Sequence, residues 1–360
     1  MTFRVDADAH IDETEATWEY MTQAEREFKP ITLDPPKGVA PIEGDSRPHR
    51  FWYLDGQVTL RHWRDDKRTG TTEATRELLD VPARLRHMDE LGLDVQVIYP
   101  TYLLGARSER PEVELALCRS YNRWLADRTA ATNGRLRWVV VPPVLSLDAA
   151  IEELRFGKEH GACGVFKRAV DFDGRVVSDP YFFPLYEEAM RLDLPICSHT
   201  GGTPGRTNAG PRSNVGTAPR EQLGCFTYLA GNHVPERFPT LRFGVIEAMA
   251  SWIPHVIVEL KAKELYRVWS THAEQKFELR EDFLRKNRFF VTCQTSDDIP
   301  WLLKYGAEDQ LMIGTDYTHM DQSGDMDAHE FIERMGEDEE IPMEVAGKIV
   351  GDNARVFYGL

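Results

Sequence analysis

Cysteine is scarce in this chain, and the few cysteines are scattered. The 360 residues include five of them, an odd number without a Cys-x-x-Cys pair. This pattern argues against a disulfide framework and against a thiolate zinc site. It fits a reducing compartment, so we expect a cytoplasmic protein.

Long hydrophobic runs are missing as well. No stretch approaches the roughly 18–20 consecutive apolar residues that a membrane span requires. The N-terminus, Met-Thr-Phe-Arg-Val-Asp-Ala-Asp, lacks the basic segment and apolar stretch of a signal peptide. We therefore expect a protein that is neither exported nor associated with a membrane.

Positive charge is also in deficit. Lys and Arg total 43 against 59 Asp and Glu, which gives a formal net charge of −16. Such a balance argues against binding to nucleic acid, because that binding depends on a basic surface. A small anionic ligand would need cations gathered locally.

The remaining composition is that of a globular protein, with 42% hydrophobic and 28% charged residues. Short β-rich apolar runs indicate eight strands, at 3–10, 94–100, 136–142, 162–168, 195–200, 242–248, 289–294 and 311–316. Helical spacing follows most of them, at 79–91, 112–132, 146–160, 179–193, 253–268 and 296–306. Such alternation predicts a parallel sheet. Eight units predict one α/β domain over residues 1–360, a (β/α)₈ TIM barrel, with a doubly wound open sheet as the alternative.

Two insertions interrupt the alternation. Residues 11–78 are polar and rich in proline, glycine and charge, which predicts a long loop or lid after the first strand. Residues 201–218 form a smaller insertion after the fifth strand. Both follow the C-terminal ends of strands, and barrels build their active sites on that face.

Side chains that can bind metal recur at the ends of the predicted strands. Asp8 and His10 end the first strand, His199 the fifth, Glu247 the sixth and Asp316 the eighth. Residues i and i+2 of a strand face the same side, and the first and eighth strands of a closed barrel are neighbours. Alone, each residue has an ordinary structural explanation, such as a capped loop, a buried hydrogen bond or a salt bridge. Together on one face they favour one Zn²⁺ or Mn²⁺ ion.

Two of the strand-end residues, and a histidine that follows one of them, are candidates for catalysis. Glu247 can act as a general acid or base, as a further ligand or as a structural residue, and we favour the first role. His319 follows Asp316 by three residues, where it can orient that carboxylate, face a substrate or cap the next segment. We therefore take Glu247, Asp316 and His319 as the candidate catalytic residues.

Four other residues are candidates for substrate binding. Lys167 and Arg168 end the fourth strand, where a cation can pair with a substrate carboxylate or form an ordinary salt bridge. Trp252 can form a wall of the pocket or pack in the core. Arg50 lies in the predicted lid and can contact a substrate from there.

Several motifs spread over nearly the whole chain carry a family resemblance. They are Val5-Asp-Ala-Asp-Ala-His, Arg84-Leu-Arg-His-Met-Asp-Glu-Leu-Gly-Leu-Asp, Asp179-Pro-Tyr-Phe-Phe-Pro, Leu194-Pro-Ile-Cys-Ser-His-Thr-Gly, Phe238-Pro-Thr-Leu-Arg-Phe-Gly, Met312-Ile-Gly-Thr-Asp-Tyr-Thr-His and Gly351-Asp-Asn-Ala-Arg. Together they resemble the amidohydrolase superfamily, in the branch that contains amino-carboxymuconate-semialdehyde decarboxylase and related aromatic-acid decarboxylases.

The resemblance implies one divalent metal ion, held here by Asp8, His10, His199 and Asp316. The family usually has His-x-His on its first strand. Asp8 stands in place of the first of these histidines, which adds negative charge and favours Mn²⁺ more than a three-histidine site would. The family's decarboxylases also tend to have a histidine after the sixth strand, and Glu247 takes that place here.

The resemblance further implies a homodimer and an enzyme that acts on a small-molecule carboxylate. Non-oxidative decarboxylation of an aromatic or unsaturated acid is the leading interpretation. Hydrolysis of a cyclic amide, a lactone or an activated C–C bond is the alternative, because one fold and one metal site serve both chemistries. A barrel without metal or activity is a third, less favoured possibility.

Overall fold

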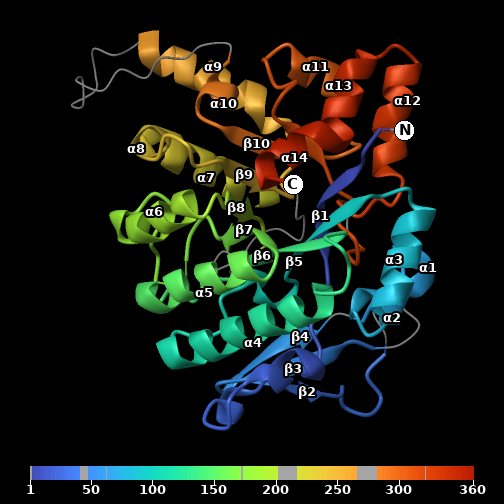
Figure 1. The fold of residues 1–360 in the computed structure, drawn as a ribbon, viewed down its shortest axis with the longest axis vertical. Helices are drawn as coiled ribbons and strands as arrows, with labels where there is room; N and C mark the ends of the chain where they lie inside the picture. The colour runs from blue at the N-terminus through green and yellow to red at the C-terminus, as the bar shows by residue number, and fades with distance from the viewer. Residues whose placement is uncertain are drawn as a thin grey trace.

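Eight parallel strands form the centre of the fold (Figure 1). The computed structural model describes residues 2–40, 48–61, 63–171, 173–201, 217–265, 282–320 and 322–360. Within these residues the strands pair in the order β1-β5-β6-β7-β8-β9-β10-β11. Their bounds are β1 (Val5–His10), β5 (Val95–Tyr99), β6 (Leu136–Val140), β7 (Ala162–Lys167), β8 (Ile196–His199), β9 (Phe243–Ile246), β10 (Phe289–Cys293) and β11 (Leu311–Ile313). Each lies within the range that the sequence indicated, so all eight predicted strands are confirmed.

The residues that follow β11 bring the last strand against the first. The backbone N–H of Asp316 donates to the carbonyl of Asp8 at 2.9 Å, and the N–H of His10 donates to the carbonyl of Tyr317 at 3.0 Å. Gly314 permits this close approach, because a Cβ at this position would lie 2.5 Å from Cβ and 2.8 Å from the backbone nitrogen of Asp8. The TIM-barrel-like α/β fold is therefore confirmed, and the open-sheet alternative is wrong.

Helices alternate with the strands and surround them (Figure 1). The longer ones are α3 (Val81–Glu90), α4 (Pro111–Thr129), α5 (Leu147–Glu159), α6 (Phe183–Arg191), α7 (Thr217–Gly231), α9 (Trp252–Leu265) and α12 (Ala328–Glu337). The shorter ones are α8 (Val234–Arg237), α10 (Phe283–Lys286), α11 (Ile299–Leu303), α13 (Met343–Gly347) and α14 (Asn353–Tyr358), with the turns η3 (Tyr102–Leu104), η4 (Pro180–Phe182) and η6 (Lys348–Asp352). Their apolar faces pack on the buried strands and form one hydrophobic core.

The helical segments largely match those expected from the sequence. Those expected at 79–91, 112–132, 146–160 and 179–193 are confirmed as α3, α4, α5 and η4 with α6. The segment at 296–306 is shortened to α11. The last three residues of the segment at 253–268, and all but Gly201, Thr217 and Ala218 of the insertion at 201–218, lie outside the described residues.

The insertion after β1 is not one long loop, so that part of the prediction is wrong. It holds an antiparallel sheet of β2 (Ile31–Leu33), β3 (Arg50–Leu54) and β4 (Gln57–Arg61), with η1 (Glu15–Tyr20), η2 (Arg26–Phe28), α1 (Asp66–Thr69) and α2 (Glu73–Arg76) around it. The two-residue turn Asp55-Gly56 joins β3 to β4, with φ of 49° and 78°. Asp-Gly is a preferred sequence for such a turn, because both residues need positive φ.

No helix among the described residues is both long and apolar enough to cross a membrane.

Candidate metal centre

The metal-binding side chains expected from the sequence meet at the carboxyl ends of the strands. Asp8 and His10 belong to β1, His199 ends β8, and Asp316 follows β11. All four are almost completely buried. The alternation along β1 turns Asp8 and His10 to the same side, and the contact between β11 and β1 places Asp316 beside them.

Three of these side chains converge on the Nε2 atom of His10. That atom lies 3.1 Å from Nε2 of His199, 3.3 Å from Oδ1 of Asp8 and 3.3 Å from Oδ1 of Asp316. Nε2 of His199 is also 3.3 Å from Oδ1 of Asp8. Ligands about 2.0–2.1 Å from a tetrahedral ion stand about 3.3 Å apart. Asp8, His10 and His199 therefore have the mutual spacing of ligands that share one ion, and Asp316 stands at that spacing from His10.

The hydrogen bonds of the two imidazole rings indicate which of their nitrogens face each other. Nδ1 of His10 lies 2.8 Å from the carbonyl of Pro100, and Nδ1 of His199 lies 2.9 Å from the carbonyl of Thr200. A carbonyl only accepts, so each Nδ1 carries a proton, and in a neutral ring Nε2 then carries a lone pair. Two lone pairs and the Asp8 carboxylate thus face one another, an arrangement that a metal ion or a proton stabilises.

The pKa values reflect the same electrostatics. Burial and the neighbouring His319 lower the pKa of His10 to about 3. Burial alone would also lower the pKa of His199, but the carboxylates of Asp8 and Glu247 outweigh it and raise that pKa to about 9. Without a metal, a proton on His199 would supply the positive charge. A divalent cation would fit the same position. The imidazole nitrogens and carboxylate oxygens there are a donor set that zinc and manganese accept.

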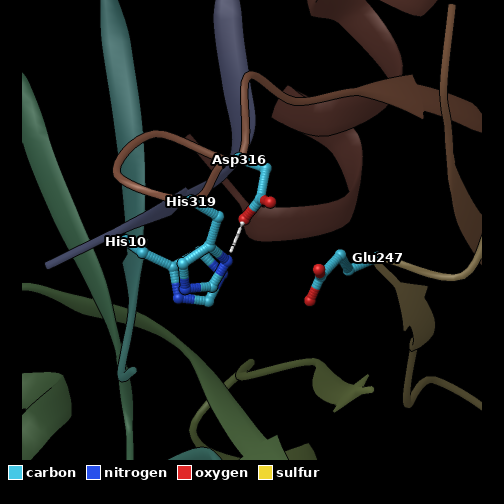
Figure 2. A group of neighbouring side chains, drawn as sticks. All are labelled: His10, Glu247, Asp316 and His319. Atoms are coloured by element: carbon cyan, nitrogen blue, oxygen red, sulfur yellow. Dashed lines mark ion pairs between the residues drawn. The ribbon is translucent and has the colours of Figure 1, made fainter. Parts of the chain in front are cut away.

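A second group of side chains shares His10 and adds Glu247 and His319 to Asp316 (Figure 2). One ligand atom from each lies within 4.8 Å of the others. Nδ1 of His319 is 2.7 Å from Oδ1 of Asp316, and its Nε2 is 3.3 Å from the hydroxyl of Thr101. The carboxylate of Glu247 points toward the other three side chains in Figure 2. His319 therefore contacts Asp316 directly, and its role in orienting that carboxylate stays a prediction.

Glu247 is held in place by one predicted residue of the site and by two neighbours that sequence reasoning missed. Its Oε2 lies 3.5 Å from Nδ1 of His199, and the hydroxyl of Ser323 donates to its Oε1 at 3.0 Å. Its backbone N–H donates to the hydroxyl of Thr292. Glu247 and Asp316 have φ of 52° and 47°, a conformation that costs energy for residues other than glycine. Such strain is concentrated at functional sites. The two missed neighbours, Ser323 and Thr292, belong to no sequence motif that could have indicated them.

Asp6 supports the metal ligands from within β1. Its carboxylate accepts hydrogen bonds from the backbone N–H and the hydroxyl of Thr315, at 2.8 and 2.6 Å, and from the amide of Gln96 at 2.8 Å. Arg84 in turn donates to Gln96 and to the carbonyl of His10. This buried network fixes both ends of the contact between β1 and the residues after β11. The only sequence signal for Asp6 was its place two residues before Asp8.

The residues expected to bind substrate have partners within the chain. Lys167 forms a buried ion pair with Asp171, and Arg168 donates to the carbonyls of Leu103 and Leu104. The indole N–H of Trp252 donates to the carbonyl of Met249.

Arg50 lies on the surface, at the start of β3 in the inserted sheet. Its exposed side chain pairs with Asp34 at 3.1 Å. Nothing in these contacts brings Arg50 or Trp252 to the four ligands, and a role of any of the four candidates in substrate binding stays a prediction.

Comparisons with known proteins agree with this fold. A family model described as amidohydrolase matches residues 5–360. The fold is similar to that of an amidohydrolase from Mycobacterium avium subsp. paratuberculosis, at 18% identity and a TM-score of 0.78, covering 100% of this chain and 99% of that one.

Two decarboxylases are also similar in fold. One is 2,6-dihydroxybenzoate decarboxylase from Rhizobium, at 16% identity and a TM-score of 0.65, covering 100% of this chain and 99% of that one. The other is a dihydroxybenzoic acid decarboxylase from Polaromonas with bound manganese and the inhibitor 2-nitroresorcinol, at 17% identity and a TM-score of 0.66, covering 100% and 98%. The match of the family model over nearly the whole length decides the family: this chain belongs to the amidohydrolases.

Proposed function

We propose that this protein is a metal-dependent decarboxylase that removes CO₂ from a small aromatic or unsaturated carboxylic acid without an oxidant. The observation that carries the proposal is the convergence of Asp8, His199 and Asp316 on Nε2 of His10, at 3.1–3.3 Å. The similarity in fold to two benzoate-type decarboxylases supports decarboxylation over other reactions of the family.

The four ligands would hold one Zn²⁺ or Mn²⁺ ion. Such an ion is a Lewis acid that can orient and polarise the oxygen atoms of a bound carboxylate. The chain's own part is to fix the donor atoms, which it does through the carbonyls of Pro100 and Thr200 and through the hydrogen bond between His319 and Asp316.

The reaction also needs one proton at a defined place. When the C–C bond to the carboxylate breaks, CO₂ leaves and the carbon keeps the electron pair, so this carbon must be protonated. We assign the proton transfer to Glu247, whose carboxylate faces the centre and is oriented by Ser323. Asp316 and His319 share a hydrogen bond of 2.7 Å and keep the opposite side of the centre in place.

Product analysis in ¹⁸O-labelled water tests the reaction type. The purified protein, loaded with Mn²⁺ or Zn²⁺, is assayed with hydroxybenzoates and with cyclic amides. We expect CO₂ release and no ¹⁸O in the organic product. Entry of ¹⁸O into that product would establish hydrolysis instead. Hydrolysis is the alternative because a glutamate, Glu247, stands after β9 where the family's decarboxylases tend to have a histidine. No bound ion under any added metal would support a barrel without activity.

Glu247→Gln separates the three roles open to this residue. Glutamine keeps the shape of the side chain but cannot transfer a proton at neutral pH, and general acid–base catalysis typically contributes about 10²–10⁴-fold to a rate. We expect kcat to fall by about 10²-fold or more while the bound metal stays stoichiometric. Steady-state rates and elemental analysis of the same sample measure both quantities.

The matched control for this experiment is Glu236→Gln on α8, a surface glutamate whose ion pair is with His233. It should leave rate and metal content unchanged. Loss of the metal in Glu247→Gln would make Glu247 a ligand. An unchanged rate with a lower stability would make it a structural residue.

A further inference from the structure

The end of the barrel that holds the metal centre also carries a group of cations. Lys167 and Arg168 stand at the end of β7, and Arg107 follows β5 by a short segment. Asp171 is the nearby acid, and it forms an ion pair with Lys167 and lies 3.7 Å from Arg168. One carboxylate thus stands against three cations, in a chain whose net charge is −16.

Two other carboxyl groups near these cations do little to balance them. Glu13 accepts hydrogen bonds from three backbone N–H groups of residues 101–103, and burial raises its pKa to about 7. Glu114 accepts from the N–H of Leu145, and burial likewise raises its pKa to about 7. Near neutral pH each is therefore charged only in part. An excess of positive charge remains on this side.

The segment that carries Arg107 runs beside the metal centre. At its start, the hydroxyl of Thr101 contacts Nε2 of His319 at 3.3 Å. Further on, the carbonyls of Leu103 and Leu104 accept from Arg168, and a Cβ built on Gly201 would lie 3.5 Å from the side chain of Leu104. The segment thus extends from the residues after β11 to the ends of β7 and β8. These contacts place Arg107 on the same face of the barrel as the four ligands.

The guanidinium of Arg107 is fixed in one position. Its Nε donates to the carbonyl of Tyr102 at 2.5 Å, and its central carbon lies 4.3 Å from the centre of the Tyr102 ring. Gly105 makes room for it, because a Cβ there would lie 3.0–3.2 Å from three guanidinium atoms. The two terminal nitrogens form the outer edge of the group, which is the fork that binds a carboxylate in a bidentate way.

This fork has no acidic partner in the part of the chain that the structure describes. The ion pairs there join other arginines to carboxylates, and none includes Arg107. Burial lowers the pKa of Arg107 most, and the charge of Arg168 lowers it further; Tyr102 and Glu13 act in the opposite direction but do not outweigh them. An anion bound at the fork would stabilise the positive charge of Arg107 against burial and against the repulsion from Arg168.

We propose that Arg107, with the charge of Arg168 behind it, forms a carboxylate-binding subsite beside the metal centre. Arg107 supplies the fork, whereas the Nε and one terminal nitrogen of Arg168 are occupied by backbone carbonyls. The assignment of its ligand rests on the proposed function. The substrate is then a small acid with two anionic groups, of which one reaches the metal and the other binds Arg107.

Anion binding is tested first on the metal-free protein, with isophthalate as the probe in calorimetric titrations. We expect the wild type to bind isophthalate and Arg107→Gln to bind it at least about 10-fold more weakly. A loss of this size in affinity corresponds to the loss of one hydrogen bond to a charged group. Arg107→Lys should fall between them because it keeps the charge without the fork. Arg86→Gln on the exposed surface of α3 is the matched control and should bind like the wild type.

Absence of binding to the wild type, or equal binding to the wild type and a folded Arg107→Gln, would overturn the subsite. Circular dichroism and the thermal midpoint establish that each variant is folded. These outcomes do not depend on turnover. Binding that requires Arg107 therefore supports the subsite even in a protein that decarboxylates none of the acids assayed.

Binding at two points is tested on the metal-loaded protein by comparing isophthalate with benzoate. The wild type should favour isophthalate by at least about 10-fold, and Arg107→Gln should lose that preference. A preference of equal size in both proteins would contradict the proposed substrate class.

Discussion

The Asp316→Asn variant is expected to lose its metal ion on dialysis and to lose about 10³-fold or more in activity. Asn has the shape of Asp but no charge, so one of the carboxylates that face His10 no longer offsets the charge of the ion. Loss of a group that only orients a ligand already costs about 10–100-fold in metal affinity, and loss of a ligand costs more. A bound divalent ion would contribute several kcal/mol to the proposed reaction, and about 1.4 kcal/mol corresponds to tenfold in rate.

Elemental analysis after dialysis, together with initial rates of CO₂ release, measures this prediction. Asp325→Asn is the control, because Asp325 lies on the same stretch after β11 and bonds to Thr295 and Asp327 outside the centre. That variant should keep its ion. If Asp316→Asn retained a stoichiometric ion and full activity, Asp316 would be no ligand, and the proposed centre would reduce to Asp8, His10 and His199.

The strands and the ligands could be predicted because both are local properties of the sequence. Runs such as Val95–Tyr99 and Phe289–Cys293 are apolar throughout, as expected for strands buried on both faces of a barrel. Once eight parallel strands are placed, barrel topology alone gathers their ends. The position of His199 at the end of β8 was therefore enough to bring it to His10, far away in the sequence.

The residues that sequence reasoning missed act through contacts that only the folded chain creates. Ser323 reaches Glu247 from a loop without a recognisable pattern. The position of Arg107 depends on Gly105 and on the carbonyl of Tyr102, and its guanidinium forms no ion pair among the described residues; no motif encodes any of these features. The β3–β4 hairpin is different. Its Asp55-Gly56 turn was visible in the sequence, but the polar composition of the surrounding insertion concealed it.

The hairpin also shows why the insertion belongs to the site. The carboxylate of Asp55 in the turn accepts a hydrogen bond from the hydroxyl of Ser108 at 2.6 Å and pairs with Arg110. The ring of Trp52 packs 5.3 Å from that of Tyr102. The inserted sheet thus rests on the segment that contains Arg107. A change in the insertion would therefore act on that guanidinium through this segment.

Gly314→Ala is expected to destabilise the protein and to weaken the metal centre together. The added Cβ would lie 2.5–2.9 Å from three atoms of Asp8, and two of them are backbone atoms that cannot turn aside as a flexible side chain does. Overpacking of this kind costs about 1–3 kcal/mol. Relief requires β1 and the residues after β11 to separate, which moves Asp8 and Asp316 away from each other. Urea unfolding of the metal-free protein measures the first effect, and metal affinity measures the second.

Gly347→Ala provides the comparison, because its added Cβ would meet only the side chain of Thr2 at 3.9 Å. Alanine is the better helix former, so α13 should gain up to about 1 kcal/mol. Normal stability and metal affinity in Gly314→Ala would mean that the contact between β11 and β1 is loose enough to admit a methyl group. The spacing of the proposed ligands would then not depend on a tight contact between β11 and β1. A loss of both properties in Gly314→Ala alone would show that barrel closure itself sets the distance between Asp8 and Asp316.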